Sequence, residues 1–122
     1  MITIDNNKNI GITRGDIGSF TLKVKQADNT YYQFKTSDRV YFTVKKNYAD
    51  STPIIRKTIT FSEETDTCTI SLVASDTNFG SLIGGERKYV YDISINEIET
   101  VVGYDQDGAK YFIIYPEVSN DE

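Results

Sequence analysis

The side chains that most often carry out chemistry are sparse in this 122-residue sequence. It contains no histidine, which excludes the commonest general base, most zinc sites and every nucleophile activated by a histidine. A glycosidase needs only two carboxylates, but most of the 18 aspartates and glutamates fall in turn segments, and no spacing pairs any two of them. We therefore expect no enzyme, no metal site and no cofactor.

The single cysteine is better explained by packing than by reactivity. Cys68 lies in the run CTISL (68–72), where apolar and hydroxyl side chains alternate. We predict a small buried side chain rather than an activated thiol. One cysteine forms no internal disulfide, and the sequence has no signal-like or membrane-spanning apolar run. These features predict assembly in a reducing cytoplasm and no membrane partner.

The tripeptide Arg14-Gly15-Asp16 matches a sequence that integrins recognise in adhesive proteins. A three-residue match often arises by chance, so it predicts little by itself. We interpret it as a turn between the first two strands, with Gly15 supplying the turn and Asp16 bonding the returning backbone.

The segment Asp105-Gln106-Asp107-Gly108 resembles the start of a calcium-binding loop. The match fails because glycine comes two positions too early and Pro116 stands where a glutamate is required. This segment is predicted to be a tight turn with no bound cation.

The nine tyrosines are the strongest candidates for binding, because tyrosine offers a rigid ring with a polar tip and the sequence has no tryptophan. Tyr89 and Tyr91 alternate with polar residues and are predicted to face the core. Four others fall in or near connectors and are our candidate partner-binding residues, namely Tyr31, Tyr32, Tyr48 and Tyr104. The net charge of −5, with scattered lysines, argues against nucleic acid as the partner.

Period-2 alternation identifies the elements that must position these residues. It is clearest at Val40, Phe42 and Val44, and it recurs around residues 20–24, 54–61, 88–96 and 110–115. Lys57 interrupts the pattern and indicates a bulge or an edge strand. Residues 1–9 are interpreted as a leader into a strand near Ile10. A single helical turn, capped by Ser75 or Asp76 and ended by Gly84-Gly85, is predicted to place Phe79 and Leu82 on one side.

About seven short strands, turns every eight to fifteen residues and one helical turn predict an all-β fold, an antiparallel β-sandwich rather than a barrel. No repeat, linker or low-complexity segment occurs, so residues 1–122 are expected to form a single domain.

Five segments carry a family resemblance: GITRGD (11–16), SFTL (19–22), DRVYFTVKK (38–46), PIIRKTI (53–59) and KYVYDI (88–93). They resemble small immunoglobulin-like β-sandwich proteins of phage and prophage tail and baseplate modules, similar to the N-terminal adaptor domain of upper baseplate proteins. The resemblance spans roughly residues 10–115. The chain has Ala74-Ser75-Asp76 where relatives often have a Pro-Glu-Asp turn, and no functional residue carries over.

The resemblance implies a non-enzymatic structural component of a phage particle, located in the virion and assembled in the host cytoplasm. Its partners would be other tail or baseplate proteins, and further copies of itself within the particle. Two alternatives stay open, a carbohydrate-binding module that uses exposed tyrosines and a cell-surface adhesion domain.

Overall fold

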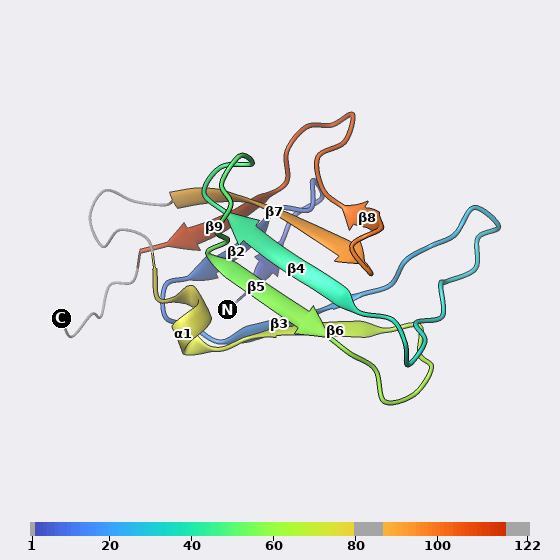
Figure 1. The fold of residues 1–122 in the computed structure, drawn as a ribbon. Helices are drawn as coiled ribbons and strands as arrows, with labels where there is room; N and C mark the ends of the chain where they lie inside the picture. Colours follow the sequence, from blue (N-terminus) through green and yellow to red (C-terminus); the bar gives the residue numbers. More distant parts are fainter. Residues whose placement is uncertain (1, 80–86, 117–122) are drawn as a thin grey trace.

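The computed structural model describes residues 2–79 and 87–116, which form two β-sheets and one short helix, arranged as in Figure 1. β-Strand is the main regular secondary structure of the described residues, as the alternating sequence pattern predicts. In chain order the elements are β1 (Thr3–Ile4), β2 (Ile10–Thr13), β3 (Gly18–Leu22), β4 (Val40–Lys45), β5 (Ile55–Ile59), β6 (Cys68–Leu72), α1 (Ala74–Thr77), β7 (Arg87–Ile95), β8 (Glu99–Val102) and β9 (Tyr111–Tyr115).

The large sheet has seven strands in the order β1-β2-β9-β7-β4-β5, with β8 pairing with β7 outside this path. Strand β7 is central, and β4 runs antiparallel along one side of it with Val40 opposite Ile95. Along the other side, β9 pairs with the first half of β7 and β8 with the second half. Because β5 ends the order, the interrupted alternation at Lys57 marks an edge strand, as predicted.

The small sheet consists of β3 and β6, and the apolar core lies between the two sheets. The Phe20 ring of β3 meets the Phe42 ring of β4 edge-on, with centroids 5.7 Å apart. Most inward positions predicted from alternation are buried, namely Val40, Phe42, Val44, Ile55, Tyr91, Ile93 and Ile95. Tyr89, also predicted to face the core, packs against it but is only half-buried. Cys68 is buried as predicted, and burial raises the pKa of its thiol to about 11. The residues between these positions on β4 and β7 face outward.

Helix α1 joins the two sheets at one end of the core. The N-cap is Val73, so the prediction that Ser75 or Asp76 occupies this position is wrong. Asp76 is the third helical residue, and its carboxylate accepts a hydrogen bond from the Val73 backbone N–H at 2.8 Å. It also forms an ion pair with Lys57 of β5, at 2.6 Å between Nζ and Oδ2. The predicted helical turn is therefore present. The other residues predicted for it, Leu82 and Gly84-Gly85, lie outside the described residues.

The prediction of a purely antiparallel arrangement is wrong at one pair of strands. β2 and β9 run parallel, with Ile10 opposite Phe112 and Thr13 opposite Tyr115. Parallel neighbours need a long crossover, and here almost the whole chain separates the two strands. Alternation within a strand carries no information about the direction of a partner so distant in sequence, which is why the sequence did not predict this pairing.

Two short strands were also missed. Residues 1–9 are not only a leader, because β1 pairs antiparallel with β2, with Thr3 opposite Gly11. β8 forms a hairpin with β7, and the register shifts between Ile93 and Ser94. Strands of two and four residues are too short for alternation to identify them.

Candidate functional site

The four candidate tyrosines lie at opposite ends of β4. Tyr31 and Tyr32 belong to the connector that precedes β4, whereas Tyr48 follows β4 and Tyr104 follows β8. The exposed fractions are 44% for Tyr31, 49% for Tyr48 and 71% for Tyr104, while Tyr32 is half-buried. The structure therefore brings Tyr48 and Tyr104 together, but it does not join all four residues into one surface.

The first end is fixed by hydrogen bonds around Asp38, a carboxylate that is only 5% exposed. Asp38 accepts hydrogen bonds from the Tyr32 hydroxyl at 2.7 Å, the Lys35 backbone N–H at 2.9 Å and the Asn96 amide at 2.9 Å. The bond from the Lys35 backbone makes the largest contribution to holding the pKa of Asp38 below its ordinary value. In turn, hydrogen bonding to Asp38 raises the pKa of Tyr32.

Asn96 ties the β7–β8 turn to the same network. Its side-chain oxygen accepts a hydrogen bond from the Arg39 backbone N–H at 2.8 Å, and its own N–H donates to the Arg39 carbonyl, also at 2.8 Å. We call this region, the connector residues 31–39 together with the turn 96–98, the pinned end. It holds the hydroxyl of Tyr32 inside the protein and leaves Tyr31 at the surface.

The β7–β8 turn presents an apolar residue that the sequence analysis missed. Ile98 is 88% exposed. It follows Asn96 and Glu97, which both have positive φ angles, 55° and 58°. Two successive positive φ angles are typical of a tight hairpin turn, where glycine usually occupies the second position. The pattern Asn96-Glu97 between alternating segments was the available signal, but the expected glycine is absent.

At the other end, Tyr48 and Tyr104 form an exposed pair. Their rings meet edge-on with centroids 5.9 Å apart, although they come from loops far apart in the sequence. Desolvation is the largest cause of the raised pKa of Tyr48. Two aromatic side chains that already pack against each other lose less conformational entropy when a ligand binds, which favours a binding role.

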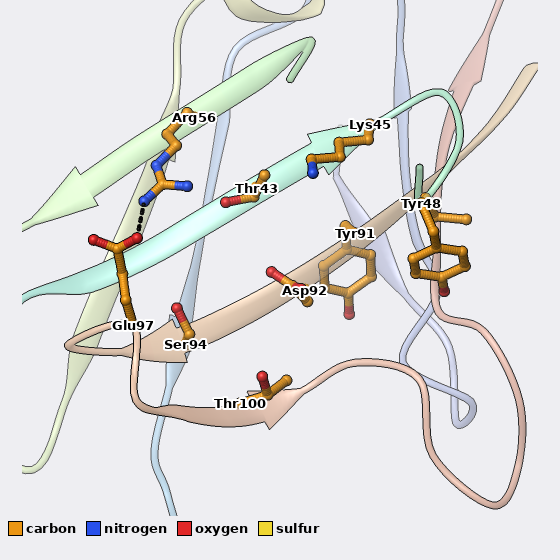
Figure 2. Close-up of a pocket in the computed structure, with 10 residues that line it drawn as sticks. Thr43, Lys45, Tyr48, Arg56, Tyr91, Asp92, Ser94, Glu97 and Thr100 are labelled. Carbon is orange, nitrogen blue, oxygen red and sulfur yellow. Dashed lines mark ion pairs between the residues drawn. The ribbon is translucent and has the colours of Figure 1, made fainter. Parts of the chain in front are cut away.

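Beside this pair, the outer face of the large sheet is hollowed by a groove of about 290 Å³. Its floor is made by outward residues of neighbouring strands, Thr43 and Lys45 of β4 with Asp92 and Ser94 of β7. Figure 2 shows Tyr48 at one end of the groove. Strand alternation produces this arrangement, because the residues between these positions point into the core.

The opposite end of the groove is closed by Arg56 of the edge strand β5. Its guanidinium forms an ion pair with Glu97, at 3.3 Å between Nη2 and Oε2, which Figure 2 marks with a dashed line. It also lies over the Tyr41 ring, 4.5 Å from the centroid. These two contacts orient Arg56, so the far wall of the groove is fixed as well.

Asp92 is the central charged group of the groove. It is half-buried, and this burial raises the pKa of its carboxyl, while the charges of Lys45 and Arg56 act in the opposite direction. No other side chain or backbone group of the described residues donates a hydrogen bond to it. Asp92 is therefore a carboxylate near the sheet surface to which none of the described residues donates a hydrogen bond.

Gly103 permits the chain after β8 to pass close to this carboxylate. A Cβ atom on Gly103 would lie 2.8 Å from Cγ2 of Thr100 and 3.2 Å from Cβ of Asp92. Any larger residue would push Thr100 or the loop away from the groove.

The signal for the groove that was available in the sequence was the outward alternation on β4 and β7. Strand pairing was needed to place Lys45 and Asp92 on one floor.

The motifs weighed from the sequence have structural roles. The Arg14 side chain is 8% exposed, and Gly15 has a φ of 84° in a turn that Asp16 closes by donating its N–H to the Thr13 carbonyl. The Asp105 carboxylate accepts a hydrogen bond from the nearly buried Lys110 ammonium at 2.8 Å. Within residues 2–79 and 87–116, no three acidic or cysteine side chains gather into a metal-binding group.

Comparisons with known proteins return no assignment: no family model, curated protein or solved structure matches the chain. In the part of the chain that the structure describes, no helix has the length and apolar character needed to cross a membrane.

Proposed function

We propose that this chain is a non-enzymatic structural component of a bacteriophage or prophage particle, which docks onto tail or baseplate neighbours through its pinned end. The observation that carries the proposal is the fixed exposure of Ile98 at the strained β7–β8 turn. A large apolar side chain that is 88% exposed on a turn held by hydrogen bonds resembles a protein-binding anchor.

Strain supports the same interpretation. Glu97 adopts a left-handed backbone conformation that costs a residue with a side chain roughly 1–2 kcal/mol. Such strain is concentrated where a segment must present a particular surface. Tyr31, on the connector at this same end, adds a second exposed ring, and the Lys23 ammonium lies 5.2 Å from its centroid.

The strand order supports an immunoglobulin-like sandwich as the finer description of the fold. Strands β9-β7-β4-β5 correspond to the G-F-C-C′ order of one sheet in variable-type domains, and β3-β6 to neighbouring strands B and E of the other. The helical turn between β6 and β7 stands where strands E and F are connected. Domains of this architecture commonly bind through turns and loops at their ends, as we propose for the pinned end.

The chemistry of the described residues supports a non-enzymatic role. The buried Cys68 thiol has a raised pKa, which opposes formation of a thiolate nucleophile. The carboxylates of Asp38 and Asp105 are already hydrogen-bonded within the protein. Hydrolase assays on glycans, peptides and phosphoesters should therefore give background rates, and turnover that disappears with one aspartate substitution would contradict this part of the proposal.

The docking role is tested in assembled particles. Quantitative mass spectrometry of purified virions should detect the wild-type chain, and cryo-electron microscopy should place it in the tail or baseplate. Ile98→Asp should lower its incorporation at least tenfold, because a charge would be buried at the contact. Ile17→Asp is the matched control, since Ile17 is 69% exposed near α1, away from the pinned end, and incorporation should be normal.

Absence of the wild-type chain from purified virions would overturn the structural role. Equal incorporation of Ile98→Asp and wild type would overturn the choice of the pinned end as the docking surface.

A further inference from the structure

The groove on the outer face of the large sheet shares one residue, Glu97, with the pinned end, and its lining has a definite chemical character. At about 290 Å³ it lies near the lower end of the range for small-molecule sites, roughly 300–1,000 Å³. Its floor is polar, with the hydroxyls of Thr43, Ser94 and Thr100 around the carboxylate of Asp92. An apolar ligand would leave these groups without hydrogen-bond partners, so the lining disfavours one.

The charges also disfavour strongly ionic ligands. Lys45 and Arg56 would repel a cation, and the Asp92 carboxylate at the centre would repel a phosphate or a carboxylate. Glu97 offsets the charge of Arg56 through their ion pair, so the four charged groups sum to zero. A neutral ligand with several hydroxyl groups meets none of these penalties.

Hydrogen bonding in the groove matches such a ligand. The Asp92 oxygens accept only, the Lys45 ammonium donates only, and the three hydroxyls do either. Adjacent hydroxyl groups of a sugar can donate to the two oxygens of one carboxylate while accepting from a neighbouring ammonium. Because no described group donates to Asp92, its acceptor capacity is available to a ligand.

Tyr48 supplies the apolar component of the site. A sugar ring carries hydroxyl groups around its edge and C–H groups on its faces, so it stacks on an aromatic ring while its edge is hydrogen-bonded. Tyr48 lines the groove, and Tyr104 packs against it edge-on. The aromatic wall and the polar floor therefore stand next to each other, as recognition of a sugar requires.

We propose that the groove binds one neutral sugar residue of a glycan, with Asp92 and Lys45 hydrogen-bonding its hydroxyl groups and Tyr48 stacking on its face. Thr43 and Ser94 complete the polar floor, and Thr100 of β8 lines the groove beside them, at a place where Gly103 lets the chain pass close to Asp92. This activity goes beyond docking in a particle, and the side chains proposed to contact the sugar are not those of the pinned end. The domain can therefore hold a neighbour at the pinned end while its sheet face contacts a cell-surface polysaccharide.

The test uses the full purified chain and defined ligands. Neutral tetrasaccharides of glucose, galactose, rhamnose and N-acetylglucosamine are titrated by isothermal calorimetry and by amide NMR shifts, with polyglycerol phosphate as the anionic comparison. At least one neutral tetrasaccharide should bind saturably, with shifts confined to β4, β7 and the Tyr48 and Tyr104 loops. Asp92→Asn and Tyr48→Ala should each weaken that binding at least tenfold.

Two matched controls separate the site from the rest of the surface. Tyr115→Ala removes an exposed tyrosine elsewhere on the large sheet, and Asp107→Asn neutralises an exposed carboxylate outside the groove. Both should bind like wild type. Thr43→Val keeps the side-chain shape, and a weakening of threefold or more would support the polar floor even if another variant folds poorly.

Failure of every neutral tetrasaccharide to bind would overturn the proposal, as would binding of polyglycerol phosphate alone or equal losses in the control variants. None of these outcomes depends on the amount of the chain incorporated into virions, which tests docking. Failure of the glycan site and failure of docking are therefore distinguishable.

Discussion

Two aspartates near β4 and β7 show how the pinned end differs from the groove. Asp38, at the pinned end, accepts three hydrogen bonds from protein groups, and its pKa is lowered. Asp92, in the groove, accepts none from the described residues, and its pKa is raised by burial. Burial alone does not determine the state of a carboxylate, because the number of donors around it decides whether its charge stabilises the fold. The carboxylate of Asp38 stabilises the connector and the β7–β8 turn, whereas the carboxylate of Asp92 can accept hydrogen bonds from a ligand.

The pinned end and the groove both pack against the same core. The largest expected change in the free energy of unfolding therefore comes from truncating a core side chain. Phe42 is fully buried and contacts the rings of Phe20, Tyr91 and Phe112. Phe42→Ala should lower the free energy of unfolding by about 3–5 kcal/mol, measured by chemical denaturation. Tyr104→Ala, which removes an exposed ring, should change it far less. A loss near zero for Phe42→Ala would contradict the assignment of sheet faces.

The next largest effect is expected at Asp38. In Asp38→Asn an amide N–H₂ would replace one acceptor oxygen and face a donor, so the free energy of unfolding at pH 7 should fall by about 1.5–3 kcal/mol. The lowered pKa means that the contribution of Asp38 is present above its unfolded value, near 3.8, and is lost as the pH falls through the folded value. Denaturation at pH 7 and pH 2.5 should therefore show the variant converging with wild type in acid. A constant difference at both pH values would contradict the role of the charge.

A substitution of Glu97 at the β7–β8 turn should change the free energy of unfolding by a smaller amount and in the opposite direction. Glu97→Gly relieves the left-handed strain at a φ of 58° and should raise the free energy of unfolding by about 1 kcal/mol, despite losing an exposed ion pair. Glu99→Gly, in β8, is the control and should destabilise, because glycine weakens a strand. If both variants destabilise equally in thermal or chemical melts, the turn is not strained.

The smallest effect on stability is expected in the groove. Because burial raises the folded pKa of Asp92, the folded state binds its proton more tightly than the unfolded state, and stability falls as the pH rises through that interval. Asp92→Asn should therefore be slightly more stable than wild type at pH 7 and equal to it well below pH 4. Destabilisation at pH 7 would show that Asp92 stabilises the fold as Asp38 does, and would remove the contrast between the groove and the pinned end.

The sequence predicted what depends on local pattern. The inward faces of β4 and β7, the buried Cys68 and the edge position marked by Lys57 all follow from alternation, which each strand carries within itself. The groove could not be predicted in this way, because Lys45 and Asp92 share a floor only after β4 pairs with β7. The Tyr48–Tyr104 contact likewise depends on two loops whose conformations are set by the assembled sheet.

The parallel pairing of β2 and β9 has a mechanical consequence. If the domain is stretched along these strands by its two ends, β1 can peel away first, since it holds β2 through only two residue pairs. The force then acts on the parallel pair β2–β9, in which Ile10–Thr13 are hydrogen-bonded to Phe112–Tyr115. Pulling the two ends apart slides these strands along each other in opposite directions. In that geometry the hydrogen bonds are loaded together in shear instead of opening one after another. Single-molecule pulling should show a first unfolding event at low force, followed by one that needs a higher force.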